Sequence, residues 1–324
     1  MEQSVNQNKT FLEFLPVSFF GGIMGLSGLC FAWRSAHNIW LLPRLIGEII
    51  GLIAILSFIA LSLTYLIKWK RYPNLVRGEF SHPVSVSFFA TIIISLLLIP
   101  GIIRPYYALF AFWLWVFAAA MMFFFAIYVI RKWLDNVQNP ENALPAWVLP
   151  VVGTLDVPIV GSSFDHAGAR EVCILFFGVG IIFAIILLPI IISRLLFQPQ
   201  LPVLLQPTLM ILTGPFALAF SGYIALNYKQ DFISAVFFYF NIFLFCILSS
   251  KILYIPRSCP FRATWWAVSF PLVAITLSSF HYFEAHNDIV HYTLAAIFLA
   301  LSTLVISYLF FQTIYRITTN SFDA

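Results

Sequence analysis

Apolar stretches interrupted by helix-breaking residues alternate along this sequence with smoother apolar stretches. The interruptions read Pro16-Val-Ser-Phe-Phe-Gly-Gly, Pro83-Val-Ser-Val-Ser-Phe-Phe, Pro150-Val-Val-Gly, Thr213-Gly-Pro215 and Ser269-Phe270-Pro271. The stretches at 106–130, 231–254 and 289–315 contain no glycine or proline. A broken helix leaves backbone groups unpaired, and lipid cannot satisfy them, whereas a protein interior or a water-filled cavity can. The broken stretches are therefore predicted to lie inside the protein and the smooth ones outside.

The composition is that of an integral membrane protein. Hydrophobic residues make up 61% of the 324 residues and charged residues 9%, whereas soluble domains contain about 25% charged residues. About 20 apolar residues allow a helix to cross the hydrocarbon core. On this criterion ten membrane-spanning helices are predicted, at 14–33, 44–67, 84–103, 106–130, 145–162, 171–193, 205–225, 231–254, 264–283 and 289–315. They form one transmembrane domain over 14–316, between an N-terminal segment at 1–13 and a C-terminal tail at 317–324.

The basic residues divide unequally between the two sides that ten spans define. Twelve of the 17 lysines and arginines fall at the N-terminus, in the loops after the even-numbered spans and at the C-terminal end. Because cytoplasmic loops carry the excess of Lys and Arg, both termini are predicted to be cytoplasmic. The basic loops are expected to contact membrane lipids, not nucleic acid.

Each broken span and the smoother span after it form a predicted helical hairpin. Five hairpins would close into an inner ring of five pore-lining helices and an outer ring of five, an all-α fold. The helix kinks are expected at Pro16, Pro150, Pro215 and Pro271. The alternation is imperfect, because the third span has no break at its centre and the sixth contains glycines and a proline.

Motifs for catalysis or metal binding are missing from the sequence. The six histidines lie at or near span ends, and the four cysteines are scattered without a CxxC pair. No phosphate-binding loop, nucleophile elbow or zinc-protease motif occurs. We therefore expect no enzymatic activity, no metal and no cofactor.

A pore between the broken spans would be lined by backbone, hydroxyl and aromatic groups without an acidic ring. Hydroxyls, freed amides and helix N-termini suit an anion, and the basic cytoplasmic loops raise the local anion concentration. The candidate lining residues are Ser18, Phe19, Gly21, Ser87, Phe88, Gly153, Asp156, Thr213, Gly214 and Ser269.

Two residues in the broken spans have more than one interpretation. Asp156 lies between two breaks, and an ionisable residue within the membrane is a functional candidate by default. It is a proton- or substrate-binding group, a neutral side chain or cap for freed backbone donors, or a residue nearer the interface. Phe270 lies beside Pro271 at mid-span; it either packs between helices or closes a narrow lumen, since a hydrophobic constriction can gate by excluding water.

Three stretches resemble the tellurite-resistance/dicarboxylate transporter family, which includes bacterial TehA and the slow-type anion channels of plant guard cells. They are Phe20-Gly21-Gly-Ile-Met-Gly25-Leu26…Ala32-Trp33, Glu79…Pro83…Ser87-Phe88 and Trp266-Ala-Val-Ser-Phe270. The resemblance implies a homotrimer with a pore in each subunit, five kinked inner helices and Phe270 as the residue that occludes the pore. For a bacterial member it implies the inner membrane.

Residues and resemblance together favour a passive channel for small inorganic anions such as chloride or nitrate, gated by Phe270. The alternative is a proton-coupled carrier of dicarboxylates or tellurite-like oxyanions, with Asp156 as the coupling group.

Overall fold

The computed structural model describes residues 11–166, 168–252 and 259–319, and all regular structure in these ranges is helical. Nine helical segments in this part of the chain are long and apolar enough to cross a membrane. The predicted fifth span is shorter and covers Pro145–Gly161. The prediction of an all-α multi-pass membrane protein is therefore confirmed at the level of helix content and hydropathy.

Five segments, here called the broken segments, start in short 3₁₀ or α-helical turns and continue as α-helices. They are η1 and α2 (Val17–Phe19, Phe20–Trp40), α5 and α6 (Ser85–Phe88, Ala90–Ile103), η3, α8, η4 and α9 (Pro145–Val148, Leu149–Val152, Gly153–Leu155, Asp156–Gly161), η5 and α11 (Val203–Thr213, Gly214–Asn227), and η6 and α14 (Ala263–Val268, Ser269–His286). The break in the third predicted span lies at Phe89, between α5 and α6, where the sequence indicated no internal break.

The other five, here called the continuous helices, have no such change of helix type. They are α3 (Arg44–Arg71), α7 (Ala108–Asp135), α10 (Ala169–Phe197), α12 (Phe232–Ile252) and α15 (Ile289–Thr318). The sixth predicted span is among them, since α10 stays helical through Pro189.

Proline marks the places where the α-helices of the broken segments begin. Pro215 is the second residue of α11, Pro150 the second of α8 and Pro271 the third of α14, while Pro16 directly precedes η1. The first turn of a helix tolerates proline because its N–H groups have no intrahelical partner there. These four prolines, predicted as kinks within helices, thus lie at junctions where a helix starts.

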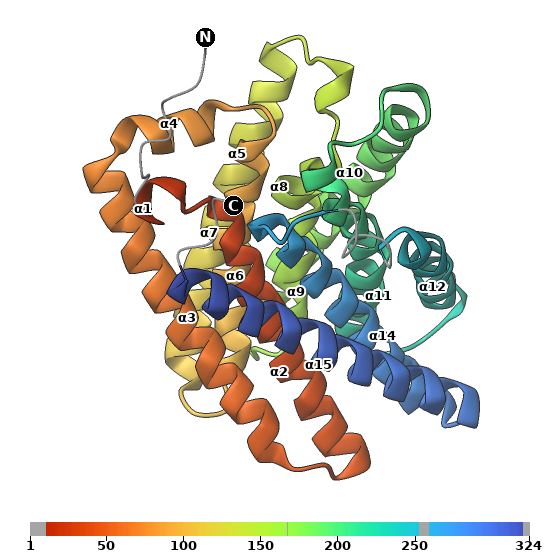
Figure 1. Cartoon of the computed structure of the whole chain (residues 1–324). Coiled ribbons are helices and arrows are strands. Elements are labelled where there is room, and N and C mark those ends of the chain that lie inside the picture. The colour runs from red at the N-terminus through yellow and green to blue at the C-terminus, as the bar shows by residue number, and fades with distance from the viewer. Residues whose placement is uncertain (1–10, 167, 253–258, 320–324) are drawn as a thin grey trace, which may run out of the picture.

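Burial separates the two kinds of segment. In the four long broken segments, 72–78% of the most apolar window is buried inside the protein, against 17–33% in the continuous helices. Nearly all of Pro145–Gly161 is buried as well. Figure 1 shows α3 and α12 at opposite sides of the molecule, with α2, α9 and α11 between them.

The broken segments contact one another in a closed order. Helix α2 packs against α6, α6 against α9, α9 against α11, α11 against α14, and α14 against α2. Each continuous helix packs against the broken segment that precedes it in the chain: α3 on α2, α7 on α6, α10 on α9, α12 on α11 and α15 on α14. The chain is therefore a series of hairpins whose first and last broken segments meet.

Glycines in α2 permit the contact that joins the first broken segment to the last. A Cβ at Gly25 would lie 2.4 Å from the Ser269 Oγ, and one at Gly28 would lie 2.7 Å from a Val273 methyl carbon. Because no side chain intervenes, α2 approaches α14 closely.

Among the described residues, three short helices lie outside these segments: α1 (Phe11–Phe14), α4 (Pro73–Ser81) and η2 (Pro140–Asn142). Helix α4 lies in a stretch predicted as a basic loop and is tied to α3 by polar contacts. The Lys68 ammonium is fully buried and pairs with Glu79, which also accepts a hydrogen bond from the Tyr65 hydroxyl at 2.7 Å. Lys68 is thus a structural residue of α3, not a loop charge.

Candidate functional site

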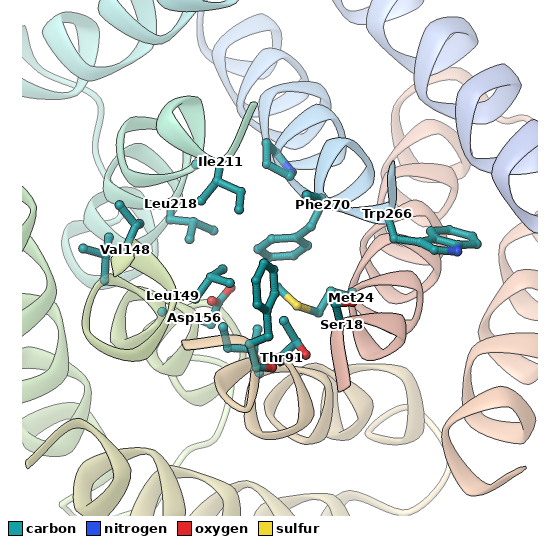
Figure 2. Close-up of a pocket in the computed structure, with 18 of the residues that line it drawn as sticks. Ser18, Met24, Thr91, Val148, Leu149, Asp156, Ile211, Leu218, Trp266 and Phe270 are labelled. Atoms are coloured by element: carbon teal, nitrogen blue, oxygen red, sulfur yellow. Dashed lines mark hydrogen bonds between the residues drawn. The ribbon is translucent and has the colours of Figure 1, made fainter. Parts of the chain in front are cut away.

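One cavity, here called the junction cavity, lies where the broken segments change helix type. It has a volume of about 50 Å³ and is lined by all five broken segments. Its walls are mostly apolar, as Figure 2 shows for Met24, Ile211, Leu218 and Phe270. The full lining comprises Ser18, Gly21, Met24, Phe88, Thr91, Ile94, Val148, Leu149, Val152, Gly153, Asp156, Ile211, Gly214, Pro215, Leu218, Ala263, Thr264, Trp266, Ala267, Phe270 and Pro271.

A second cavity, here called the terminal cavity, lies toward the C-terminal ends of the same helices. Its volume is about 230 Å³, and all five broken segments line it too. Arg104 gives it a positive charge that the junction cavity lacks, and His281 adds an imidazole. The lining comprises Gly28, Phe31, Ser35, Leu98, Gly101, Arg104, Ile159, Val160, Ser163, Leu218, Ser221, Phe270, Ala274, Leu277 and His281.

Phe270 and Leu218 are the two residues that line both cavities. Phe270 is 9% exposed and directly precedes Pro271 in the first turn of α14. Its ring projects into the space between the segments in Figure 2. Phe270 therefore stands between two cavities that follow the same set of helices.

The predicted lining residues divide into two groups. Ser18, Gly21, Phe88, Gly153, Asp156 and Gly214 line the junction cavity together with Phe270. Four others line neither cavity, in contrast to the prediction: Phe19, Ser87, Thr213 and Ser269. Phe19 instead borders a different apolar pocket with residues of α3 and α15, and Ser87 is fully buried.

Hydroxyl groups at the junctions of the broken segments bond to nearby backbone carbonyls. In four broken segments a hydroxyl donates to the carbonyl three residues earlier: Thr91 to Phe88 (2.6 Å), Thr154 to Val151 (2.7 Å), Thr213 to Met210 (2.9 Å) and Ser269 to Trp266 (2.7 Å). A change from 3₁₀ to α-helix leaves carbonyls without a regular partner, and a nearby hydroxyl can satisfy them. These hydroxyls therefore satisfy backbone carbonyls at the junctions.

Hydroxyls of neighbouring segments also bond to the carbonyls at the first junction. The Ser95 hydroxyl lies 3.0 Å from the Phe20 carbonyl and the Ser269 hydroxyl 3.3 Å from the Gly21 carbonyl, so each shares its hydrogen between this carbonyl and a nearer one in its own segment. Buried carbonyls need such partners because an unpaired polar group in an apolar interior is costly. The junction of the first segment is thereby tied to the third and the ninth predicted spans.

Asp156 is the first residue of α9 and is fully buried. Neither of its carboxyl oxygens has a hydrogen-bond partner among the described residues. The interpretation that it caps freed backbone donors is therefore wrong. In Figure 2 it lies on the same side of the junction cavity as Leu149, across from Trp266.

The sequence prediction missed several lining residues, although a simple signal was available. Ser18 and Gly21 were predicted, and Met24 continues the same three-residue spacing; Phe88 likewise predicts Thr91. Residues three apart lie on one face of a helix. The same helical spacing leads from Leu98 and Gly101 to Arg104, and from Phe270, Ala274 and Leu277 to His281.

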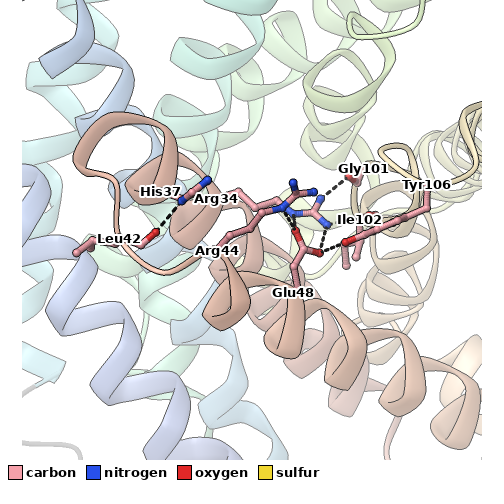
Figure 3. A network of polar contacts seen from close by, with 8 residues as sticks. All are labelled: Arg34, His37, Leu42, Arg44, Glu48, Gly101, Ile102 and Tyr106. Carbon is pink, nitrogen blue, oxygen red and sulfur yellow. Dashed lines mark hydrogen bonds and ion pairs between the residues drawn. The ribbon is translucent and has the colours of Figure 1, made fainter.

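A polar network joins the first, second and third predicted spans beside the terminal cavity (Figure 3). The Arg34 guanidinium pairs with Glu48 at 2.8 Å and donates to the carbonyls of Gly101 and Ile102 at 3.0 Å each. Glu48 also accepts a hydrogen bond from the Tyr106 hydroxyl at 2.7 Å. Because Gly101 lines the terminal cavity, this network fixes part of the cavity wall.

Within the described ranges, no group of three or more His, Cys, Asp or Glu side chains is placed to hold a metal ion.

Buried, broken helices around two internal cavities, together with exposed apolar continuous helices, define a multi-pass membrane protein. Residues 15–314 match the family described as SLAC1, voltage-dependent anion channel. The chain belongs to this family, and the resemblance to TehA and the plant slow-type anion channels is confirmed.

Curated relatives include channels from a plant and a bacterial resistance protein. The chain is 26% identical over 309 residues to the S-type anion channel SLAH2 of Arabidopsis thaliana, covering 91% of this chain and 58% of the relative. It is 25% identical over 315 residues to the guard cell S-type anion channel SLAC1 of the same plant, covering 94% and 56%. The tellurite resistance protein TehA homolog of Haemophilus influenzae is 30% identical over 182 residues, covering 56% and 55%.

The chain thus spans little more than half the length of these relatives. Two are named as anion channels and one for tellurite resistance, so the family is one of anion transport and its named members are not enzymes.

Proposed function

We propose that this protein is an anion-selective channel that passes small monovalent anions such as chloride or nitrate through a pore within each subunit. The observation that carries the proposal is the pair of cavities lined by the same five segments and separated at Phe270. An ion moving along these helices would cross both cavities and pass this ring.

The pore requires a particular arrangement of the helices. We propose that the five broken segments form an inner ring, that the five continuous helices form an outer ring, and that Pro145–Gly161 also crosses the membrane. The closed order of contacts and the contrast in burial support this arrangement. With cytoplasmic termini in a bacterial inner membrane, Arg104 and His281 would face the outer side.

Phe270 is proposed as the gate of this pore. An apolar ring in a narrow passage excludes water, and an ion that must shed its hydration cannot pass. Leu218 contributes a second apolar side chain at the same level. Opening then requires only that the ring move aside.

Replacing the Phe270 side chain tests the proposed gate. Phe270→Ala is expected to raise anion current severalfold in planar bilayers or oocytes, because the apolar closure is removed. Phe280→Leu is the matched control: Phe280 lies on the same helix, is fully buried and lines neither cavity. An unchanged current in Phe270→Ala, or an equal rise in Phe280→Leu, would count against the gate.

The second candidate is a proton-coupled carrier of dicarboxylates or tellurite-like oxyanions. It is favoured by the similarity to a tellurite resistance protein and by the buried, unpartnered carboxyl of Asp156. Saturable uptake that collapses with the proton gradient and in Asp156→Asn would support it. Unsaturated, ohmic flux would support the channel instead.

A further inference from the structure

The polar side chains that line the junction cavity are Ser18, Thr91, Asp156, Thr264 and Trp266. Three of them already donate their hydrogen to another group. Thr91 donates to the Phe88 carbonyl at 2.6 Å, Thr264 to the Leu204 carbonyl at 2.7 Å and Trp266 Nε1 to Thr313 Oγ1 at 2.9 Å. These three have no hydrogen left for a ligand.

Ser18 and Asp156 remain available. Neither side chain makes a hydrogen bond with any described residue, although Asp156 is fully buried and Ser18 is 9% exposed. They come from the first and fifth predicted spans and line the same cavity. A buried carboxyl is normally paired, so the unpaired Asp156 beside the Ser18 hydroxyl points to a ligand in this cavity.

The protonation state of Asp156 follows from its surroundings. The lining contains no Lys, Arg or His, and Asp156 is its one acidic residue. An ionised carboxylate buried without a partner is so unfavourable that such a group takes up a proton instead. The neutral carboxylic acid then has an O–H that it can donate.

We propose that the junction cavity is a binding subsite for a small monovalent anion, held by the hydroxyl of Ser18 and the protonated carboxyl of Asp156. The inference rests on the proposed function and assigns two residues the recognition of the ion. Each donates one O–H to the anion, and neither carries charge.

The size and the chemistry of the cavity restrict the ligand. A water molecule needs about 10–15 Å³ of such volume, so a cavity of about 50 Å³ holds an ion of chloride or nitrate size with little water, not a dicarboxylate. Neutral donors hold an anion weakly enough for it to leave, which conduction requires. An ionised Asp156 would repel the same ion.

The test compares Asp156→Asn, which keeps an uncharged hydrogen-bond donor, with Asp156→Leu, which removes the donor and keeps the branching at Cγ. Ser18→Ala removes the other donor. Asn241→Leu is the matched control, because Asn241 is a fully buried, unpartnered polar residue on α12 that lines neither cavity. Apparent anion affinity is read from the thermal stabilisation of purified protein by nitrate or bromide, with gluconate as the salt control.

The expected affinity losses are about tenfold or more in Asp156→Leu and Ser18→Ala, since a hydrogen bond to a charged group contributes that much. Asp156→Asn and Asn241→Leu should stay within about threefold of the wild type. Infrared spectra should show the band of a protonated carboxylic acid that disappears in Asp156→Asn.

Equal losses in Asp156→Asn and Asp156→Leu, a tighter affinity in Asp156→Leu, or the absence of the infrared band would overturn the proposal. If Asp156→Leu fails to fold, Ser18→Ala and the infrared band decide. If the protein carries anion current but the variants bind anions with unchanged affinity, the subsite is refuted and the proposed channel stands. If the protein carries no current and no anion stabilises it, the channel itself is refuted.

Discussion

Gly161 and Gly178 are both helical glycines, but an added side chain would meet opposite surroundings at the two positions. At Gly161 a Cβ would lie 2.2 Å from the Trp115 ring and 2.6 Å from the Cys173 sulfur. At Gly178, on the exposed side of α10, nothing lies within 4 Å. The Trp115 ring is fixed in place, because its Nε1 donates to the Val157 carbonyl at 3.1 Å.

We expect Gly161→Ala to lower the free energy of unfolding by about 1–3 kcal/mol, the usual effect of overpacking a core. Gly178→Ala should raise it by about 0.5–1 kcal/mol, because alanine is the better helix former. Thermal and denaturant unfolding in detergent would measure both changes. A Gly161→Ala protein as stable as the wild type would show that Trp115 can move away.

Sequence reasoning at the residue scale found the positions near the breaks but not the direction of each side chain. Ser18 and Ser269 both follow the Val-Ser-Phe pattern, yet Ser18 faces the cavity and Ser269 bonds to backbone carbonyls. The difference depends on which carbonyls the junction leaves free and which helix lies opposite. Neither is visible in a single sequence.

At the scale of elements, the sequence predicted the apolar helices better than it predicted the residues at which they begin and end. Nine long apolar helices in the described part of the chain were predictable from hydropathy, and α12 begins at Phe232, one residue after its predicted start, while its predicted end at 254 lies outside the described residues. Helix α2 runs seven residues beyond its predicted end, through Arg34, because the pairing of Arg34 with Glu48 and two carbonyls satisfies the charge. A long-range ion pair can therefore extend a helix beyond the end that hydropathy predicts.

Asp288 caps the N-terminus of α15, and its charge makes this cap depend on pH. Its carboxylate accepts hydrogen bonds from the N–H groups of Val290 at 2.9 Å and His291 at 3.0 Å. The backbone N–H and side chain of His291 hold the pKa of Asp288 below its ordinary value of 3.8. The cap is therefore fully formed above that value and is lost as the pH falls through the lower pKa of the folded state.

We expect Asp288→Ala to melt at a lower temperature than the wild type at neutral pH, because the cap is gone. The difference between the two melting temperatures should shrink as the pH falls below 3.8, where the wild type also loses its cap. Asp288→Asn should retain much of the cap without this dependence. A difference that stays constant into strong acid would show that the charge of Asp288 does not matter.

At the scale of the whole molecule, repetition in the sequence indicated a ring of hairpins, but not the residues through which its first and last broken segments meet. The alternation of broken and smooth spans predicted the hairpins, and each continuous helix does pack on the broken segment before it. The contact of α2 with α14 needs Gly25 and Gly28 opposite Ser269 and Val273, a match between residues some 245 positions apart. Local patterns in a sequence carry no information on that match.

The homotrimer with one pore per subunit that the family resemblance implies predicts how mixed assemblies conduct. Wild-type and Phe270→Ala subunits with different tags would be co-expressed, and trimers of each composition purified. Because each cavity pair is enclosed by the segments of one chain, every Phe270→Ala subunit should add one equal and independent conductance step. Single-channel records of trimers with one, two and three variant subunits would show the steps. A single conductance level that appears only in one composition would point to a shared pore between subunits.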